Sequence, residues 1–404
     1  MTKNDKPRFK ILFAITVLVI FLLALTHEVL WWDEAVYVNN ALAVAGKTEN
    51  WRFVAWERQP GIYFLEAFAL LTFGEIGFLI VALLGAFLLV LLAYRFVFEI
   101  GGSSKQAFIA GLLVAVSPPF WNTGFTLASD AWGTVTSLAA LFFYQKYLKK
   151  EERIKLIAAL FLAGISFLFR DVFVLTGAII VFWEFKKRKM GKSLLYGVIS
   201  YLLVLIAYLI DSNNRMGNPF GRILLHLELV SKSVGYVFSN PVVRISSWAG
   251  FLLACYGLVL YRSAKQFTQT FLGFACAANV LLLLFLDFQL RYALLAAVLL
   301  AIVYSISREN HDVWTYATVA VLFVYSASFL FYSFYLGPEN IPAMREACTI
   351  AKSVQGDLYT VGNAPFLSQC SQRPVYGMEA GCKGGTLLTF REKELFKPYL
   401  ENCV

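Results

Sequence analysis

Carboxylates and arginines in two short stretches near the N-terminus are the residues best suited to chemistry. Asp33 and Glu34 follow a Trp-Trp step, and Glu57 and Arg58 stand just before Pro60. A carboxylate can serve as a general base or ligate a hard metal ion, and a guanidinium can bind phosphate through paired N–H donors. These residue types therefore favour acid–base chemistry on an anionic substrate.

Further charged residues stand at the predicted turns between apolar segments. Asp130 precedes one such segment, and Arg170 and Asp171 lie where two segments meet and are expected to pair with each other. Ionisable residues in such positions are costly and commonly functional. The candidate catalytic residues are Asp33, Glu34 and Asp130. The candidate substrate-binding residues are Glu57, Arg58, Tyr63, Arg170, Arg215, Arg222 and Arg291.

Each of these residues also has a structural interpretation. Asp33 and Asp130 can act as helix N-caps, and Glu34 suits a first helical turn because the helix dipole favours an acid there. Glu57 and Arg58 can form an ordinary ion pair at the membrane surface. One residue can fill both roles, so the structural and chemical interpretations stay open.

The composition indicates the setting of these residues. The chain has 404 residues, of which 59% are hydrophobic and only 15% are charged, and its mean hydropathy is +0.65. A water-soluble domain of this size requires more polar surface. We expect an all-α polytopic membrane protein whose net charge of +9 anchors it to anionic lipid, with no nucleic-acid partner.

Apolar segments long enough for a bilayer predict about 11 transmembrane helices, the first of them retained and not cleaved as a signal peptide. Segment 33–45 reads as an amphipathic surface helix, and 62–73 as a short re-entrant or surface helix. Lys and Arg are concentrated in alternate connections, which predicts a cytoplasmic N-terminus and extracytoplasmic loops 27–61, 121–130 and 212–244. The predicted spans are 9–26, 76–98, 106–121, 129–147, 155–170, 171–185, 193–211, 245–262, 269–286, 291–307 and 313–335.

Residues 337–404 differ in composition and predict a small α/β domain outside the membrane. Apolar residues at helical spacing predict a helix over Ile341 to Val354, and Asp357 to Val361 and Arg373 to Met378 read as strands. Disulfides are permitted there. One or two are expected, with the pairing open, among Cys348, Cys370, Cys382 and Cys403.

Three motifs in order resemble the start of the GT-C glycosyltransferases, which include protein O-mannosyltransferases and aminoarabinose transferases. They are Trp31 to Tyr37 (WWDEAVY), Glu57 to Tyr63 (ERQPGIY), and Ser117-Pro118-Pro119 leading to Asp130. The resemblance covers residues 9–185. It implies inverting transfer of a sugar from a polyprenyl-phosphate carrier to an acceptor glycan, lipid or protein on the outer side of the membrane.

The resemblance also implies roles for individual residues. Asp33 matches the family's catalytic base, Asp130 the second-loop acid near the site, and Arg58, next to Glu57, the cation that contacts the carrier phosphate. No cofactor is required, although a divalent metal ion held by Asp33 and Asp130 is compatible with this pattern. The sequence departs from the family where Gln59-Pro60 replaces Pro-Pro and Gly61 replaces a bulky residue.

The family resemblance divides the chain into three segments: a catalytic transmembrane module (1–185), a variable transmembrane module (186–336) and the outer domain (337–404). The alternative function is a multi-pass transporter or lipid flippase. Such proteins usually carry paired half-repeats with broken helices. Residues 9–185 and 193–335 show no convincing repeat, and the polar residues cluster at one face, so the sequence favours the transferase.

Overall fold

The protein is described by a computed structural model. The described residues are 6–25, 32–47, 58–124, 126–127, 129–187, 191–225, 247–253, 255–257, 259–261, 270–283, 286, 289–307, 313–331, 341–360, 364–372, 374–377, 386–391 and 397–402. Of the sequence predictions, those for Glu57, Cys382 and Cys403 fall outside this set.

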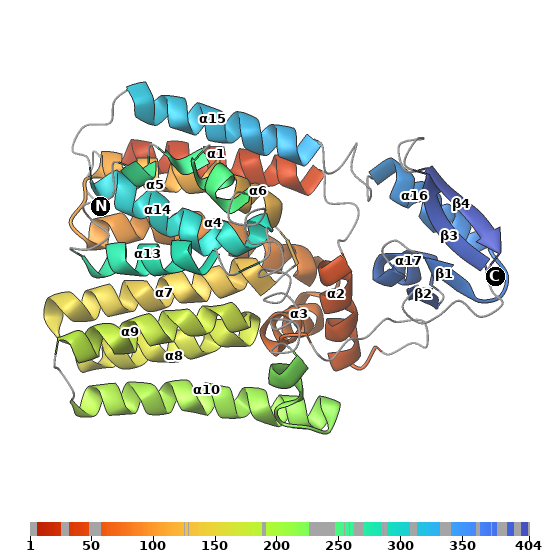
Figure 1. The fold of residues 1–404 in the computed structure, drawn as a ribbon, viewed down its shortest axis with the longest axis horizontal. Coiled ribbons are helices and arrows are strands. Elements are labelled where there is room, and N and C mark those ends of the chain that lie inside the picture. Colours follow the sequence, from red (N-terminus) through yellow and green to blue (C-terminus); the bar gives the residue numbers. More distant parts are fainter. Residues whose placement is uncertain are drawn as a thin grey trace. The chain divides into compact units, whose positions relative to one another are not determined.

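The chain divides into two compact units that do not follow chain order (Figure 1). The helical unit comprises Met1–Ile20, Gln59–Gly61 and Ala82–Ser326. The mixed unit, which contains helices and a sheet, comprises Phe21–Arg58, Ile62–Val81 and Ala327–Val404. One crossing from the mixed to the helical unit falls on the peptide bond between Arg58 and Gln59, inside a motif that the sequence predicts to be functional.

The helical unit is built from apolar helices. Many of their large apolar side chains are exposed, as in Leu195, Leu203 and Phe182, which is what contact with lipid requires. By length and composition, α4 and α10 are suited to cross a membrane. The helices that lie wholly or mainly in this unit are α1 Lys6–Leu25, α4 Ile76–Glu99, α5 Ser104–Ala115, α6 Pro118–Thr123, α7 Ser129–Lys150, α8 Arg153–Phe169, η1 Asp171–Phe173, α9 Val174–Lys186, α10 Lys192–Met216, α13 Phe271–Leu283, η2 Leu290–Ala293, α14 Leu294–Ile306 and α15 Val313–Phe331.

The predicted span over 106–121 is interrupted at its Ser117-Pro118-Pro119 step, where the helix breaks before Pro118. α5 ends at Ala115, and α6 begins at Pro118 with Ser117 between them in extended conformation. The break frees backbone carbonyls, and the indole Nε1 of Trp121 donates to the Ala115 carbonyl oxygen at 2.7 Å. Trp121 is 5% exposed, so a buried side chain provides the hydrogen bond that the Ala115 carbonyl lost where the helix breaks.

The mixed unit contains α2 (Trp32–Val44), most of α3 (Pro60–Phe73) and a small α/β domain from the C-terminal part of the chain. In that domain, β1 lies between β2 and β3 and is parallel to both, and β4 is antiparallel to β3. The helix and two strands expected from the sequence are present, and two further strands extend the sheet. The elements of the domain are α16 Ile341–Ser353, β1 Leu358–Thr360, α17 Ala364–Ser371, β2 Val375–Gly377, β3 Thr386–Arg391 and β4 Lys397–Asn402.

A compact apolar core and one disulfide hold this domain together. Met344 from α16, Leu367 from α17 and Leu388 from β3 are fully buried against one another. Cys348 and Cys370 form a disulfide between α16 and α17. The structure therefore selects one pairing among those that the sequence left open.

The two short helices of the mixed unit differ in how they bury their side chains. α2 is buried at every position over 34–41, including Asn39 and Asn40, so the predicted helix with one exposed face is wrong for this stretch. α3, in contrast, exposes Phe68 and Leu71 on one side and buries Glu66 completely. At about 1.5 Å per residue its 14 residues span roughly 21 Å, too short for the hydrocarbon core.

Candidate functional site

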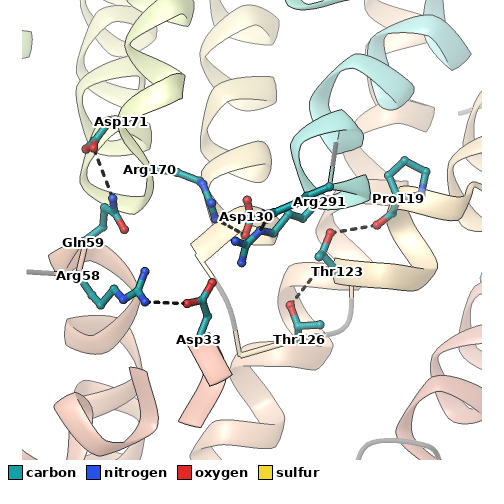
Figure 2. Close-up of polar contacts among 11 residues, drawn as sticks. Asp33, Arg58, Gln59, Pro119, Thr123, Thr126, Asp130, Arg170, Asp171 and Arg291 are labelled. Atoms are coloured by element: carbon teal, nitrogen blue, oxygen red, sulfur yellow. Dashed lines mark hydrogen bonds and ion pairs between the residues drawn. The ribbon is translucent and has the colours of Figure 1, made fainter. Parts of the chain in front are cut away.

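Asp33 lies in the first turn of α2 and forms an ion pair with Arg58 (Figure 2). The Arg58 Nη2 to Asp33 Oδ1 distance is 3.1 Å, and the two side chains are 32% and 16% exposed. Because α2 already begins at Trp32, Asp33 stands inside the helix and not at the N-cap position. The helix dipole still favours a negative charge there.

Arg58 has donor capacity beyond this pair. Its Nε atom is buried and has no hydrogen-bond partner among the described residues. A buried guanidinium N–H without an acceptor is costly, and a phosphate oxygen is a strong acceptor for it. The Asp33–Arg58 pair therefore combines a partly exposed carboxylate with a cation that can bind an additional anion.

Glu34 is not exposed beside Asp33 but is buried with Glu66 of α3. Glu34 is 1% exposed and Glu66 is 0% exposed. Both Glu66 carboxyl oxygens have no hydrogen-bond partner among the described residues. Burial raises the pKa of Glu66 well above its usual value, and the nearby Glu34 carboxylate raises it further. This geometry makes Glu34 a poorer candidate than Asp33 for direct contact with a substrate.

Asp130 and Arg170 form a second ion pair, in the helical unit (Figure 2). Arg170 Nη1 donates to Asp130 Oδ2 at 2.6 Å, and the side chains are 14% and 2% exposed. Like Asp33, Asp130 lies within the first turn of its helix, here α7. Shortly before α7, the Thr123 hydroxyl donates to the Pro119 carbonyl oxygen, and the Thr126 hydroxyl donates to the Thr123 carbonyl oxygen.

The ring of Tyr292 lies close to the guanidinium of Arg170 and also to that of Arg291. The Arg170 Cζ atom lies 4.7 Å from the centroid of the Tyr292 ring, and the Arg291 Cζ atom lies 5.4 Å from it. Figure 2 shows Arg291 directed toward Asp130 and Arg170. Two guanidiniums on one ring create a strongly positive region that suits an anionic group. Tyr292 was not among the residues predicted from the sequence, although its position directly after Arg291 could have singled it out.

Gln59 and Gly61, at the start of α3, contact residues at the end of α8 and the start of η1. The Gln59 side-chain amide donates to Asp171 Oδ2 at 3.4 Å, so Arg170 and Asp171, expected to pair with each other, each contact a residue distant in sequence. A Cβ atom on Gly61 would lie 2.9 Å from the carbonyl carbon and oxygen of Leu168. The departure from the family pattern at Gly61 is therefore required by close backbone packing. Tyr63, two residues further on, is fully buried.

The remaining two predicted arginines share one aspartate near the end of α10. Arg222 Nη1 lies 2.6 Å from Asp211 Oδ2, and Arg215 Nε lies 3.6 Å from Asp211 Oδ1. Arg222 is completely buried, with its guanidinium 5.6 Å from the ring of Tyr208. This arrangement gives Arg222 a structural role, because it ties the residues just after α10 to Asp211 of that helix.

The donor set provides little for a metal ion. Asp33 and Asp130, the two carboxylates that the sequence offers as metal ligands, each form an ion pair with an arginine. Within the described part of the chain, no group of three or more His, Cys, Asp or Glu side chains is arranged to hold a metal.

Comparisons with known proteins place this arrangement in context. Residues 60–210 match the family model for dolichyl-phosphate-mannose-protein mannosyltransferases. A crystal structure of ArnT from Cupriavidus metallidurans bound to undecaprenyl phosphate is similar in fold, with a TM-score of 0.65, 13% sequence identity and coverage of 98% of each chain. The apo structure of the same protein gives a TM-score of 0.64 at 13% identity, covering 100% of this chain and 99% of the other. No curated protein sequence matches the chain.

Proposed function

We propose that the chain is a member of the GT-C superfamily of membrane glycosyltransferases and that it transfers a sugar from a polyprenyl phosphate to an acceptor on the extracytoplasmic side of the membrane. The family match over α3 to α10 and the similarity in fold to ArnT, whose crystal structure contains undecaprenyl phosphate, support this proposal. The acceptor is a glycan, lipid or protein that presents a nucleophile at the membrane surface.

The observation that carries the proposal is the Asp33–Arg58 pair. Of the three candidate catalytic acids, Asp33 is the one with appreciable exposure, 16% against 1% for Glu34 and 2% for Asp130. A general base must reach the proton that it removes. We therefore assign Asp33 as the base and the other two acids to supporting roles.

The proposed reaction is a single displacement. Asp33 takes the proton of an acceptor hydroxyl as its oxygen attacks the anomeric carbon of the sugar. The bond from that carbon to the carrier phosphate breaks, so the configuration inverts and the polyprenyl phosphate leaves with the bonding electrons. Asp33 then releases its proton to solvent.

Arg58 supplies the stabilisation of the leaving phosphate in this proposal. It is assigned this role because its buried Nε lacks an acceptor among the described residues. Within the helical unit, Arg170 and Arg291 are assigned to binding an anionic group of the substrate because they converge on Tyr292, with Asp130 fixing the position of Arg170. Preorganised cations that meet a developing negative charge are among the strongest contributors to catalysis.

Two features support the proposed sidedness. The Cys348–Cys370 disulfide is compatible with an oxidising compartment, which favours an extracytoplasmic C-terminal domain. The Lys-rich and Arg-rich connections favour a cytoplasmic N-terminus. Both features agree with a carrier whose sugar is presented outside the cytoplasm.

Transfer of label from a radiolabelled polyprenyl-phosphate sugar, measured in membranes, tests the proposal. We expect Asp33→Asn to lower the rate by about 10²-fold or more, because the amide cannot accept the proton. The matched control is Glu152→Gln, the same chemical change in an exposed side chain whose carboxylate lies 2.7 Å from Lys155. Equal rates for the parent and Asp33→Asn would refute the assigned base. Absence of transfer by the parent with every sugar tried would favour the transporter alternative.

A further inference from the structure

The orientation of Asp33 depends on how α2 is held. Asp33 occupies the first turn of a helix of 13 residues, and the side chains over 34–41 are buried. A buried helix takes its position from the elements packed against it, and a displacement of about 1 Å at a catalytic group can cost roughly 100-fold in rate. The elements that pack on α2 are therefore part of the requirements for catalysis.

Within the mixed unit, α2 packs against α17, which lies more than three hundred residues later in the chain (Figure 1). α17 has only 8 residues. Isolated helices of this length are not stable in water, so the surrounding domain must hold α17 in place.

Three kinds of contact hold α17. Cys370 is bonded to Cys348 of α16. The backbone N–H of Val375 in β2 donates to the Ser368 hydroxyl oxygen at 3.0 Å, and that hydroxyl lies 3.3 Å from the Val375 carbonyl oxygen. Leu367 is fully buried in the apolar core of the domain. Of these contacts, the disulfide is the covalent one.

We propose that the Cys348–Cys370 disulfide and α17 form a clamp that positions α2, and with it the carboxylate of Asp33. The C-terminal domain then contributes to the chemical step without contacting the reacting atoms, and Cys370 is a positioning residue. The part of this proposal that concerns catalysis rests on the proposed function of Asp33. The mechanical part, that the disulfide restrains α2, does not.

Reduction of the disulfide tests both parts on the full-length protein in detergent micelles. A dithiol reagent such as dithiothreitol converts the protein disulfide to two thiols and is itself oxidised to a cyclic disulfide. We expect backbone amide hydrogen exchange in α2 to become at least about tenfold faster after reduction, while exchange in α7 and α8 stays unchanged. The turnover number should fall about tenfold or more, with little change in KM for the polyprenyl-phosphate sugar.

The Cys348→Ser/Cys370→Ser variant is the matched control, because dithiothreitol has no disulfide to act on there. Its α2 exchange and turnover should equal those of the reduced parent and should not respond to the reagent. If this variant fails to fold, reduction of the folded parent still gives the answer.

Two results separate the two parts. Faster exchange in α16 and α17 with unchanged exchange in α2 would overturn the clamp, whatever the activity. Faster exchange in α2 together with an Asp33→Asn variant as active as the parent would leave the clamp intact and refute the proposed role of Asp33.

Discussion

Replacement of Arg170 tests the second ion pair most directly. Asp130 is 2% exposed and its carboxylate lies 2.6 Å from Arg170 Nη1. Arg170→Met keeps most of the side-chain volume but leaves a buried carboxylate without its cation. Removing one partner of a buried pair costs about 3–5 kcal/mol. Because Arg170 is 14% exposed and solvent can partly compensate, we expect about 3 kcal/mol, more than a hundredfold in the unfolding equilibrium.

The assay is a double-mutant cycle on the free energy of unfolding in mixed micelles. Asp130→Asn should destabilise by a similar amount, since it removes the carboxylate that bonds the Arg170 guanidinium. The double variant Asp130→Asn/Arg170→Met should be less destabilised than the sum of the two, because neither buried charge remains. Transfer activity should stay low in the double variant, since the cationic cluster around Tyr292 has lost Arg170.

An exposed ion pair provides the control for this cycle. Glu152 and Lys155 lie 2.7 Å apart at the start of α8, and Glu152 is solvent-exposed. The corresponding cycle with Glu152→Gln and Lys155→Met should show no measurable coupling. If the Asp130 and Arg170 variants unfold like the parent, or if their effects simply add, the two residues are not a coupled buried pair and the reasoning fails.

Three further predictions follow from the site. Tyr292→Leu should raise KM for the polyprenyl-phosphate sugar about tenfold, because it removes two cation–π contacts, whereas Tyr292→Phe should behave like the parent; equal KM values would contradict this. Gly61→Ala should destabilise by about 1–3 kcal/mol in thermal unfolding, because its Cβ would meet the Leu168 backbone at 2.9 Å; an unchanged midpoint would disprove the close packing. Glu66→Gln should be more stable than the parent toward neutral pH. The raised pKa of Glu66 means that its contribution to stability is complete below the usual value of 4.5 and is lost as the pH rises toward the folded-state value. Unfolding midpoints from about pH 4 to pH 8 should therefore diverge, and parallel curves would contradict the prediction.

The membrane class and the residue types of the site were predictable without the structure. The apolar composition is a count over all residues, and the excess of Lys and Arg is a count within each connection. Neither count depends on tertiary contacts. The same holds for Asp33, Arg58, Asp130 and Arg170. A charged residue within an apolar sequence is a functional candidate whatever its position in the fold.

The partners of those charges depend on the tertiary structure. Arg170 bonds Asp130, 40 residues away, and Gln59 reaches Asp171 across 112 residues. Helix directions set these contacts: a helix ending at Phe169 and another starting at Ser129 bring the side chains together. No local sequence pattern indicates that residues so far apart in the chain are partners.

The burial of α2 illustrates the same limit. Its apolar residues at helical spacing predicted an exposed polar face, but Asn39 and Asn40 are completely buried. Their burial depends on packing partners such as α17, which the chain supplies more than three hundred residues later. The periodicity of apolar residues indicates which side chains favour an apolar environment. The environment that each side chain has in the fold depends on which elements, distant in sequence, pack against the helix. Long-range packing therefore determined the surroundings of Asp33, while local composition determined that an acid stands there.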